Sequence, residues 1–202
     1  MPIQINGYPL PKYVSYSALS TWLECGWKYY LTRILQTEEK PSWWLVGGSA
    51  VHTATERLDK QLLSSGVVNE DFDGLFQAAW LEELTKTVES STTDVSQWSA
   101  ASRGKEDDKW WSNQGPKMVG AWAHWRGTQE SWSLWHTPEG QPAVELELNL
   151  MLGGVPVKMI IDRVMQNEHG ELMVLDLKTG STTPKHHLQL AFYAAGIDQM
   201  FG

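Results

Sequence analysis

Apolar residues recur every three or four positions through the first two thirds of the chain, which is the period of an amphipathic helix. The first repeat runs from Leu19 to Ile34 and predicts a core-facing helix capped by Ser15 or Ser17. Three further helices are predicted, over residues 47–66, 69–89 and 116–129.

Local signals set the expected ends of these helices. Asn69 is expected to cap the helix over 69–89, and Pro116 to begin the next one, because proline suits the first turn. The stretch Ser90–Asp108 between them is polar and rich in serine and threonine, and it predicts a loop, a lid or a disordered segment.

The period changes to two after residue 140. Alternation from Val144 to Leu150 predicts a half-buried strand, and Gly153-Gly154 predicts a two-residue hairpin turn into a second strand over 155–165. A third strand is expected over 172–177, and a final helix over 185–200. The predicted class is α/β, or mixed α+β: a central mixed sheet with an antiparallel meander, flanked by helices, plus an N-terminal helical lobe.

Composition and charge restrict the function without deciding it. The net charge is −8, but residues 69–108 hold ten acidic and three basic residues, so the rest of the chain is nearly neutral. That balance disfavours a sequence-specific basic DNA binder but is compatible with a metal-dependent nuclease. Cys25 is the sole cysteine, so an iron–sulfur cluster is not expected, and neither a signal peptide nor a membrane span is predicted. The expected location is the cytoplasm.

The chemistry is concentrated in two neighbouring strands that each run from apolar residues into a carboxylate. Asp176-Leu177-Lys178 ends one strand, so Asp176 and Lys178 are expected on the same side with Leu177 facing the core. A short turn at Asn167–Gly170 would set this strand antiparallel to the one that carries Asp162. Two such carboxylates suit Mg²⁺, with Lys178 beside the scissile phosphate. On spacing alone, ordinary hairpin carboxylates with a nearby ion pair are an equally good explanation.

The order of these elements resembles the RecB-like branch of the PD-(D/E)XK nucleases. Asp162 and Asp176-Leu177-Lys178 are followed by Gln189-Leu190-Ala191-Phe192-Tyr193, as the Gln-x-x-x-Tyr helix follows in that branch. Upstream, Gly47-Gly48-Ser49-Ala50-Val51-His52 is similar to its Gly-x-x-x-His element, and Ser15–Tyr30 to its opening helix. The resemblance implies a restriction-endonuclease-like core and a single nuclease domain over 1–202, with a helical, acidic insertion at about 69–135 and a mobile loop at 90–108.

The resemblance also implies a role for each matching residue. The catalytic set would be Asp162, Asp176, Lys178 and His52. The metal ligands would be Asp162, Asp176, the Leu177 carbonyl, His52 and Glu145. Residues on the DNA-facing side would be Gln189, Tyr193, Lys185 and His186. Two departures stand out, because Met159 replaces the usual glycine three residues before Asp162, and Gly26 replaces the proline after Cys25. In relatives further strands usually follow the last helix, so both a fragment and a minimal form remain open.

Several of these residues also have a purely structural interpretation. His52 and Glu56 could form an ordinary helix-surface pair, and Glu145 could belong to a solvated sheet face. His186 could be a hydrated residue at a helix start, and Tyr193 a buried tyrosine bonded to the backbone.

The expected function is therefore that of a Mg²⁺-dependent deoxyribonuclease, an exonuclease of phage or bacterial recombination or repair, in which Mn²⁺ substitutes for Mg²⁺. DNA is the expected partner, together with a single-strand annealing or recombination protein, and the oligomeric state is open. The alternative is a catalytically inactive DNA-binding or assembly module that keeps the nuclease fold.

Overall fold

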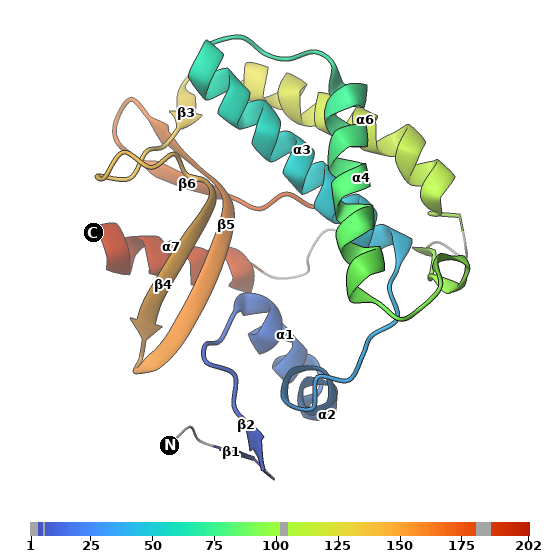
Figure 1. Ribbon diagram of the computed structural model, residues 1–202. Coiled ribbons are helices and arrows are strands. Elements are labelled where there is room, and N and C mark those ends of the chain that lie inside the picture. Colours follow the sequence, from blue (N-terminus) through green and yellow to red (C-terminus); the bar gives the residue numbers. More distant parts are fainter. Residues whose placement is uncertain (1–3, 6, 102–104, 181–186) are drawn as a thin grey trace.

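The computed structural model of the protein describes residues 4–5, 7–101, 105–180 and 187–202 (Figure 1). The elements follow in the order β1 (Gln4–Ile5), β2 (Tyr8–Pro9), α1 (Tyr16–Glu24), α2 (Gly26–Tyr29), the π-helix η1 (Tyr30–Ile34), α3 (Trp43–Ser65), α4 (Phe72–Ser90), the 3₁₀ turn η2 (Val95–Gln97), α6 (Asp108–Gly127), β3 (Trp132–Leu134), β4 (Val144–Leu152), β5 (Val155–Asn167), β6 (Leu172–Leu175) and α7 (Leu188–Phe201). Lys185 and His186, which were expected to contact DNA, lie outside the described residues.

The main sheet is built around β5, as the alternating pattern predicts. β4 and β3 pair with β5, β6 also pairs with it, and all these pairs are antiparallel. Gly153 and Gly154 turn β4 into β5 with φ of +55° and +81°, the left-handed values that a two-residue hairpin turn needs. β6 ends at Leu175, two residues before the predicted end, so Asp176–Lys178 continue beyond the strand.

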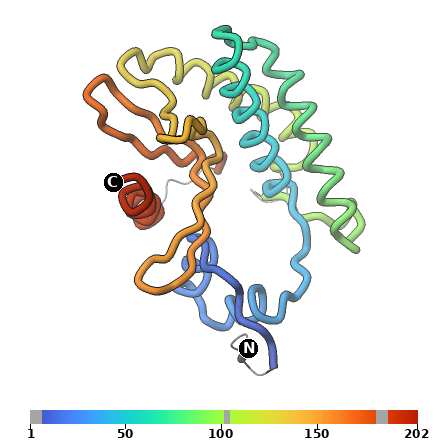
Figure 2. The backbone as a smooth tube through the Cα atoms, turned by 60° about the vertical axis from the view of Figure 1, so that its left-hand side comes forward, coloured from blue at the N-terminus to red at the C-terminus, as the bar shows by residue number. Residues whose placement is uncertain are grey.

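Helices lie on both sides of this sheet, which confirms the predicted class. Figure 2 shows the strands between α7 on one side and the bundle of α3, α4 and α6 on the other. α7 covers a core that contains Leu146, Met159 and Tyr193, while the bundle has a separate core around Phe76 and Trp111.

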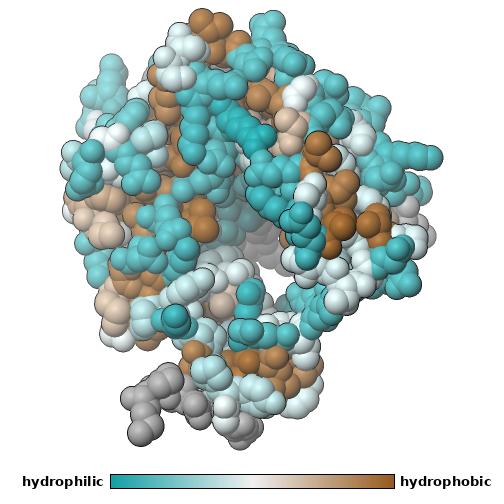
Figure 3. Space-filling model, viewed as in Figure 1, coloured by the Kyte–Doolittle hydropathy of each residue, from teal (hydrophilic) through white to brown (hydrophobic). Residues whose placement is uncertain are grey.

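The N-terminal lobe differs from the single core-facing helix predicted over residues 19–34. Cys25 is extended, with φ −163° and ψ 112°, and divides the segment into α1 and the α2–η1 helix. Trp22 and Trp27 are 57% and 66% exposed, and Figure 3 shows apolar side chains at the surface of this lobe. The prediction of burial was wrong because periodicity shows which side chains share a face, not whether a partner covers that face.

The starts of all three bundle helices also differ from prediction. α3 begins at Trp43, four residues before the predicted start at residue 47. Asp71, not Asn69, caps α4 by accepting a hydrogen bond from the Gly74 N–H, whereas Asn69 accepts one from the Asp71 N–H. α6 begins at Asp108, eight residues before Pro116, because Asp107 accepts a hydrogen bond from the Trp110 N–H and caps it there. Pro116 lies inside the helix and costs it one backbone hydrogen bond.

The polar segment between α4 and α6 contributes to the bundle. Trp98 is buried in the bundle core, and Ser99 forms a parallel bridge with Ser42 just before α3. Among the helices that the structure describes, none combines the length and apolar character needed to cross a membrane.

Candidate metal centre

Three potential ligands converge where the bundle meets the sheet. His52 comes from α3, Glu145 from β4 and Asp162 from β5, and one ligand atom of each lies within 4.8 Å of the other two. His52 Nδ1 is 3.8 Å from Glu145 Oε1 and 3.7 Å from Asp162 Oδ1. One imidazole nitrogen and two carboxylates form a donor set that suits a divalent cation.

Two glycines let α3 bring His52 to this position. A Cβ atom at Gly47 would lie 2.0 Å from the Trp111 ring, so only glycine allows that indole to pack against the helix. A Cβ atom at Gly48 would lie 3.1 Å from Thr179 Oγ1. Gly48 thus leaves room for the segment after Lys178 to pass close to the helix.

Glu145 has an unusual backbone. Its φ is +49°, a value in the left-handed region that non-glycine residues rarely adopt. The β4–β5 pairing passes from Val144–Arg163 to Leu146–Ile161, and within these described strands Glu145 and Asp162 do not form the pair between them. Strain of this kind is retained where the surroundings fix it, most often at functional sites.

The Asp162 carboxyl is poorly solvated. Burial raises the pKa of Asp162 to about 6, although the charge of His52 and the hydrogen bond from the Leu177 N–H oppose the rise, and Glu145 and Asp176 add to it. That hydrogen bond joins Leu177 N to Asp162 Oδ2 at 2.5 Å. A carboxyl in this environment gains stability when a cation is bound beside it.

The other two potential ligands influence each other's ionisation. Burial tends to lower the pKa of His52, but Glu145 and Asp162 outweigh it, so the pKa lies above its ordinary value. Burial tends to raise the pKa of Glu145, but His52 and Arg163 hold that pKa below its usual range. When His52 is protonated, its imidazolium partly neutralises the two carboxylates.

Asp176 and Lys178 form a second group beside the first. Lys178 Nζ is 2.6 Å from Asp176 Oδ2 and donates to Gln189 Oε1 at 3.1 Å. Gln189 of α7 donates in turn to Asp176 Oδ1 at 2.7 Å and to the Tyr193 hydroxyl oxygen at 3.0 Å. Gln189 of the predicted helix therefore contacts both the carboxylate and the lysine, and Tyr193 contacts Gln189. The expectation that Asp176 shares a metal with Asp162 stays a prediction, as does a role for the Leu177 carbonyl.

Leu177 itself lies differently from the sequence-based expectation. It lines a hollow of about 830 Å³ together with His52, Glu145 and Lys178, and does not face the core. The reason is that β6 has ended at Leu175, so the alternation of a strand no longer applies.

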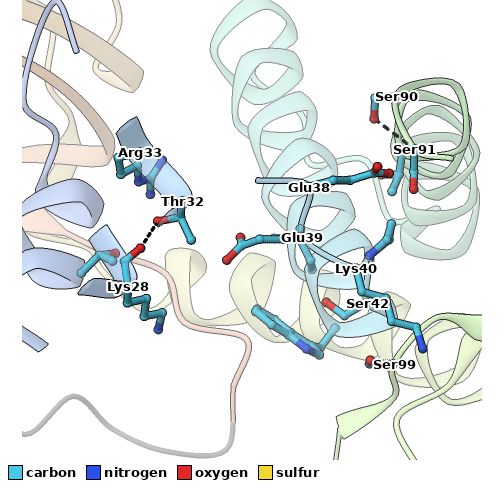
Figure 4. A pocket seen from close by; sticks show the side chains of 15 residues that line it. Lys28, Thr32, Arg33, Glu38, Glu39, Lys40, Ser42, Ser90, Ser91 and Ser99 are labelled. Atoms are coloured by element: carbon cyan, nitrogen blue, oxygen red, sulfur yellow. Dashed lines mark hydrogen bonds between the residues drawn. The ribbon is translucent and has the colours of Figure 1, made fainter. Parts of the chain in front are cut away.

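A larger hollow, of about 840 Å³, lies between the N-terminal lobe and the bundle. Figure 4 shows Lys28, Arg33 and Lys40 around it, with Glu38 and Glu39. Trp44 and Leu45 line both hollows, so the two adjoin. The larger hollow, lined by both cations and carboxylates, thus lies next to the hollow at the metal centre.

A buried ion pair next to the centre was not predicted from the sequence. Arg163 of β5 and Asp59 of α3 have fully buried side chains, and Arg163 Nε donates to Asp59 Oδ2 at 2.6 Å. One signal was present, because Asp162-Arg163 interrupts an otherwise apolar strand from Met159 to Met165.

The sequence of this chain matches a known protein family. Residues 13–202 match the model of the PD-(D/E)XK nuclease superfamily. The chain belongs to that superfamily. Its members are nucleases that use divalent metal ions, and the cluster of His52, Glu145 and Asp162 could hold one.

Two phage proteins are similar to this PD-(D/E)XK domain over most of its length. The gene 69 protein of Mycobacterium phage D29 is 29% identical over 190 residues, which cover 93% of this chain and 70% of the phage protein. The gene 69 protein of Mycobacterium phage L5 is 28% identical over 207 residues, covering 91% of this chain and 69% of the phage protein. These names assign no reaction.

The departure at Met159 has a counterpart elsewhere in the nuclease domain. Met159 is 1% exposed, and a Cβ atom at Gly196 of α7 would lie 2.4 Å from its sulfur atom. Close packing of α7 on β5 is therefore achieved by a glycine on the helix, although the strand carries a large side chain.

Proposed function

We propose that this domain is a Mg²⁺-dependent deoxyribonuclease of the RecB-like branch, and that it acts as an exonuclease in phage or bacterial recombination or repair. The observation that carries the proposal is the convergence of His52, Glu145 and Asp162 within 4.8 Å, next to Asp176 and Lys178. Nuclease activity follows from the superfamily, whereas the identity of the metal, exonuclease action and the biological role are proposals.

The residues divide into ligands and phosphate-facing groups. His52, Glu145, Asp162 and Asp176 would hold the cation, which when bound activates water and neutralises charge on the scissile phosphate. Lys178 would neutralise a phosphate oxygen or orient the attacking water. Gln189 accepts a hydrogen bond from the Lys178 ammonium, and this bond restricts the position of the ammonium before substrate binds.

The surroundings of the centre suit a nucleic-acid chain. Arg33 and Lys40 line the larger hollow that adjoins the centre, and Trp44 is 52% exposed between the two hollows. Cations bind the phosphates of a DNA strand, and an exposed indole offers a face for a base. In a recombination pathway, the exonuclease product would be passed to a single-strand annealing protein, which is the partner that we propose.

The direct test is digestion of end-labelled linear DNA and closed circular DNA. We expect degradation of the linear form with Mg²⁺ or Mn²⁺ and none with EDTA, while the circle survives. Asp162→Asn and Lys178→Met should each lower the rate by at least about 100-fold, as expected for groups that act in the transition state.

Glu147→Gln is the matched control for Glu145→Gln. Both residues are glutamates of β4, but Glu147 is paired with Lys158 at the surface.

Binding of DNA without metal-dependent cleavage would instead favour an inactive DNA-binding module. Cleavage of the closed circular DNA would show endonuclease activity and contradict the proposed exonuclease activity.

A further inference from the structure

The most unusual charged group outside the ligand set is the guanidinium of Arg163. Its side chain is fully buried, as is that of Asp59, whose Oδ2 it contacts through Nε at 2.6 Å. Desolvating such a pair is costly, so the pair by itself is weak evidence for stability. Its position directly behind the metal centre indicates another role.

The guanidinium of Arg163 bonds in several directions. Nη1 donates to Glu145 Oε1 at 3.2 Å and to the Asp162 carbonyl oxygen at 2.5 Å, and Nη2 donates to Thr55 Oγ1 at 3.3 Å. A planar guanidinium presents its donors in a fixed fork, so these contacts restrict one another. Arg163 thus connects the side chain of one proposed ligand with the main chain of another.

The helical bundle also holds Asp59, the partner of Arg163. Trp122 of α6 donates its indole N–H to Asp59 Oδ2 at 3.0 Å, and Arg126 Nε lies 3.5 Å from Asp59 Oδ1. The Arg163 guanidinium also lies over the Trp122 ring, 5.5 Å from the ring centre. Two side chains of α6 therefore hold Asp59 of α3, and Arg163 is held with it.

The Glu145 side chain needs support from its neighbours because its backbone is left-handed and Glu145 does not pair with Asp162 in the β4–β5 ladder. In the described part of the chain its carboxylate meets two cationic side chains, His52 and Arg163. If His52 serves as a metal ligand, Arg163 is the cationic side chain among the described residues that remains to orient the Glu145 carboxylate.

We propose that Arg163 is a positioning residue that holds Glu145 and the main chain of Asp162 in ligand geometry, and that Asp59 couples this geometry to the bundle. The inference rests on the proposed function, since it assumes that Glu145 and Asp162 bind the metal. It makes the bundle a supporting part of the metal centre.

Mn²⁺ titration followed by electron paramagnetic resonance tests this role without relying on activity. Arg163→Lys keeps the charge but loses the fork, and we expect the Mn²⁺ dissociation constant at pH 8 to rise about 10- to 100-fold. The matched control is Arg57→Lys, on the same helix as Asp59 but paired with Glu82 at the surface. Its Mn²⁺ affinity should equal that of the wild type.

A double-mutant cycle with Glu145→Gln tests whether Arg163 affects Mn²⁺ binding through Glu145. If Arg163 acts through Glu145, adding Arg163→Lys to Glu145→Gln should weaken Mn²⁺ binding by less than about threefold further. Losses that multiply would overturn the route through Glu145, and unchanged Mn²⁺ affinity in Arg163→Lys would overturn the positioning role. If Arg163→Lys fails to fold, Asp59→Asn, which keeps the side-chain shape, is titrated in its place with the same expectation. Failure of the wild type to cleave DNA would overturn the proposed function, whereas the Mn²⁺ titration decides the positioning role separately.

Discussion

The main-chain N–H of Leu177 donates a 2.5 Å hydrogen bond to Asp162 Oδ2, which ties the segment after β6 to the buried carboxyl of β5. Even with this donor, burial dominates and the pKa of Asp162 is about 6. In the metal-free protein, ionisation of Asp162 therefore costs free energy, and the pH dependence of stability measures that cost.

We expect the metal-free protein to lose stability as the pH rises from about 4 to about 6. In the unfolded chain the pKa of Asp162 is about 3.9, so in this window the folded state holds the proton more tightly and rising pH favours unfolding. The difference between the pKa values of the folded and unfolded states corresponds to a loss of at most about 3 kcal/mol in the free energy of unfolding. Urea unfolding in EDTA at pH 4.5 and 7.5 measures the change. Asp162→Asn should remove most of it and be more stable than the wild type at pH 7.5; lower stability there would contradict the assignment.

Metal binding should strengthen as the pH rises from about 5.5 to 8. The pKa values of His52 and Asp162 are both raised, so the protons that these residues hold at low pH must leave when a cation binds. Each proton displaced adds a factor of about ten in affinity per pH unit below the pKa of its group. Mn²⁺ titrations across this range should show the rise, with a shallower slope for His52→Gln. A pH-independent affinity would exclude both residues as ligands.

Replacing Glu145 by glycine should destabilise the protein less than replacing it by alanine, by about 1 kcal/mol. Glycine adopts a positive φ without steric cost, whereas alanine retains the strain. Comparing the two variants cancels the loss of the carboxylate, and urea unfolding gives the difference.

Glu147 provides the internal control for this comparison. It lies on the same strand, two residues along, with an ordinary backbone. There the glycine variant should be the less stable of the two, because glycine weakens a strand interior. The same order of stability at both positions would argue against a strained Glu145.

Gly47→Ala should destabilise the bundle by about 1–3 kcal/mol, because the new methyl group would lie 2.0 Å from the fully packed Trp111 ring. Gly127→Ala is the control, since nothing lies within 4 Å of a Cβ atom there and alanine favours a helix. Thermal unfolding of both variants measures the difference. Equal melting temperatures would mean that α3 and Trp111 do not pack as described.

Arg33→Glu and Lys40→Glu should each weaken DNA binding and reduce its salt dependence. Both cations line the larger hollow, and removing one cation that binds a phosphate lowers the slope of log affinity against log salt by about one. Fluorescence anisotropy with a labelled oligonucleotide at several salt concentrations, in EDTA, gives that slope. Lys117→Glu, on the exposed surface of α6, is the charge-matched control. Equal slopes for all three variants would exclude the hollow as a DNA path.

Local patterning was sufficient to predict the strands β4, β5 and β6 and the helix that follows them, whereas β3 was not predicted. The alternation from Val144 onward and the Gly153-Gly154 turn determine the hairpin, and they also place Asp162 on the strand next to β6. The positions of His52, Gln189 and Tyr193 followed from the family resemblance, since nothing local distinguishes them from ordinary helix residues.

Tertiary contacts determined what the sequence could not predict. Asp59 looks like any polar position on a helix, and its partner Arg163 lies 104 residues further along the chain. The left-handed backbone of Glu145 has no local signal either, because no glycine or asparagine stands there. Burial of the N-terminal lobe was predicted wrongly for the related reason that amphipathic periodicity does not identify a partner.

The two separate apolar cores, one in the bundle and one between α7 and the sheet, have a consequence for how the domain opens. Each core can act as its own cooperative unit in native-state hydrogen exchange. His52 belongs to the bundle, whereas Glu145 and Asp162 belong to the sheet, so a small parting of the two units would separate the ligands while both remain folded. A cation held by these three residues would bridge that boundary, and it should therefore slow the exchange of amides at the junction more than it raises protection within either core.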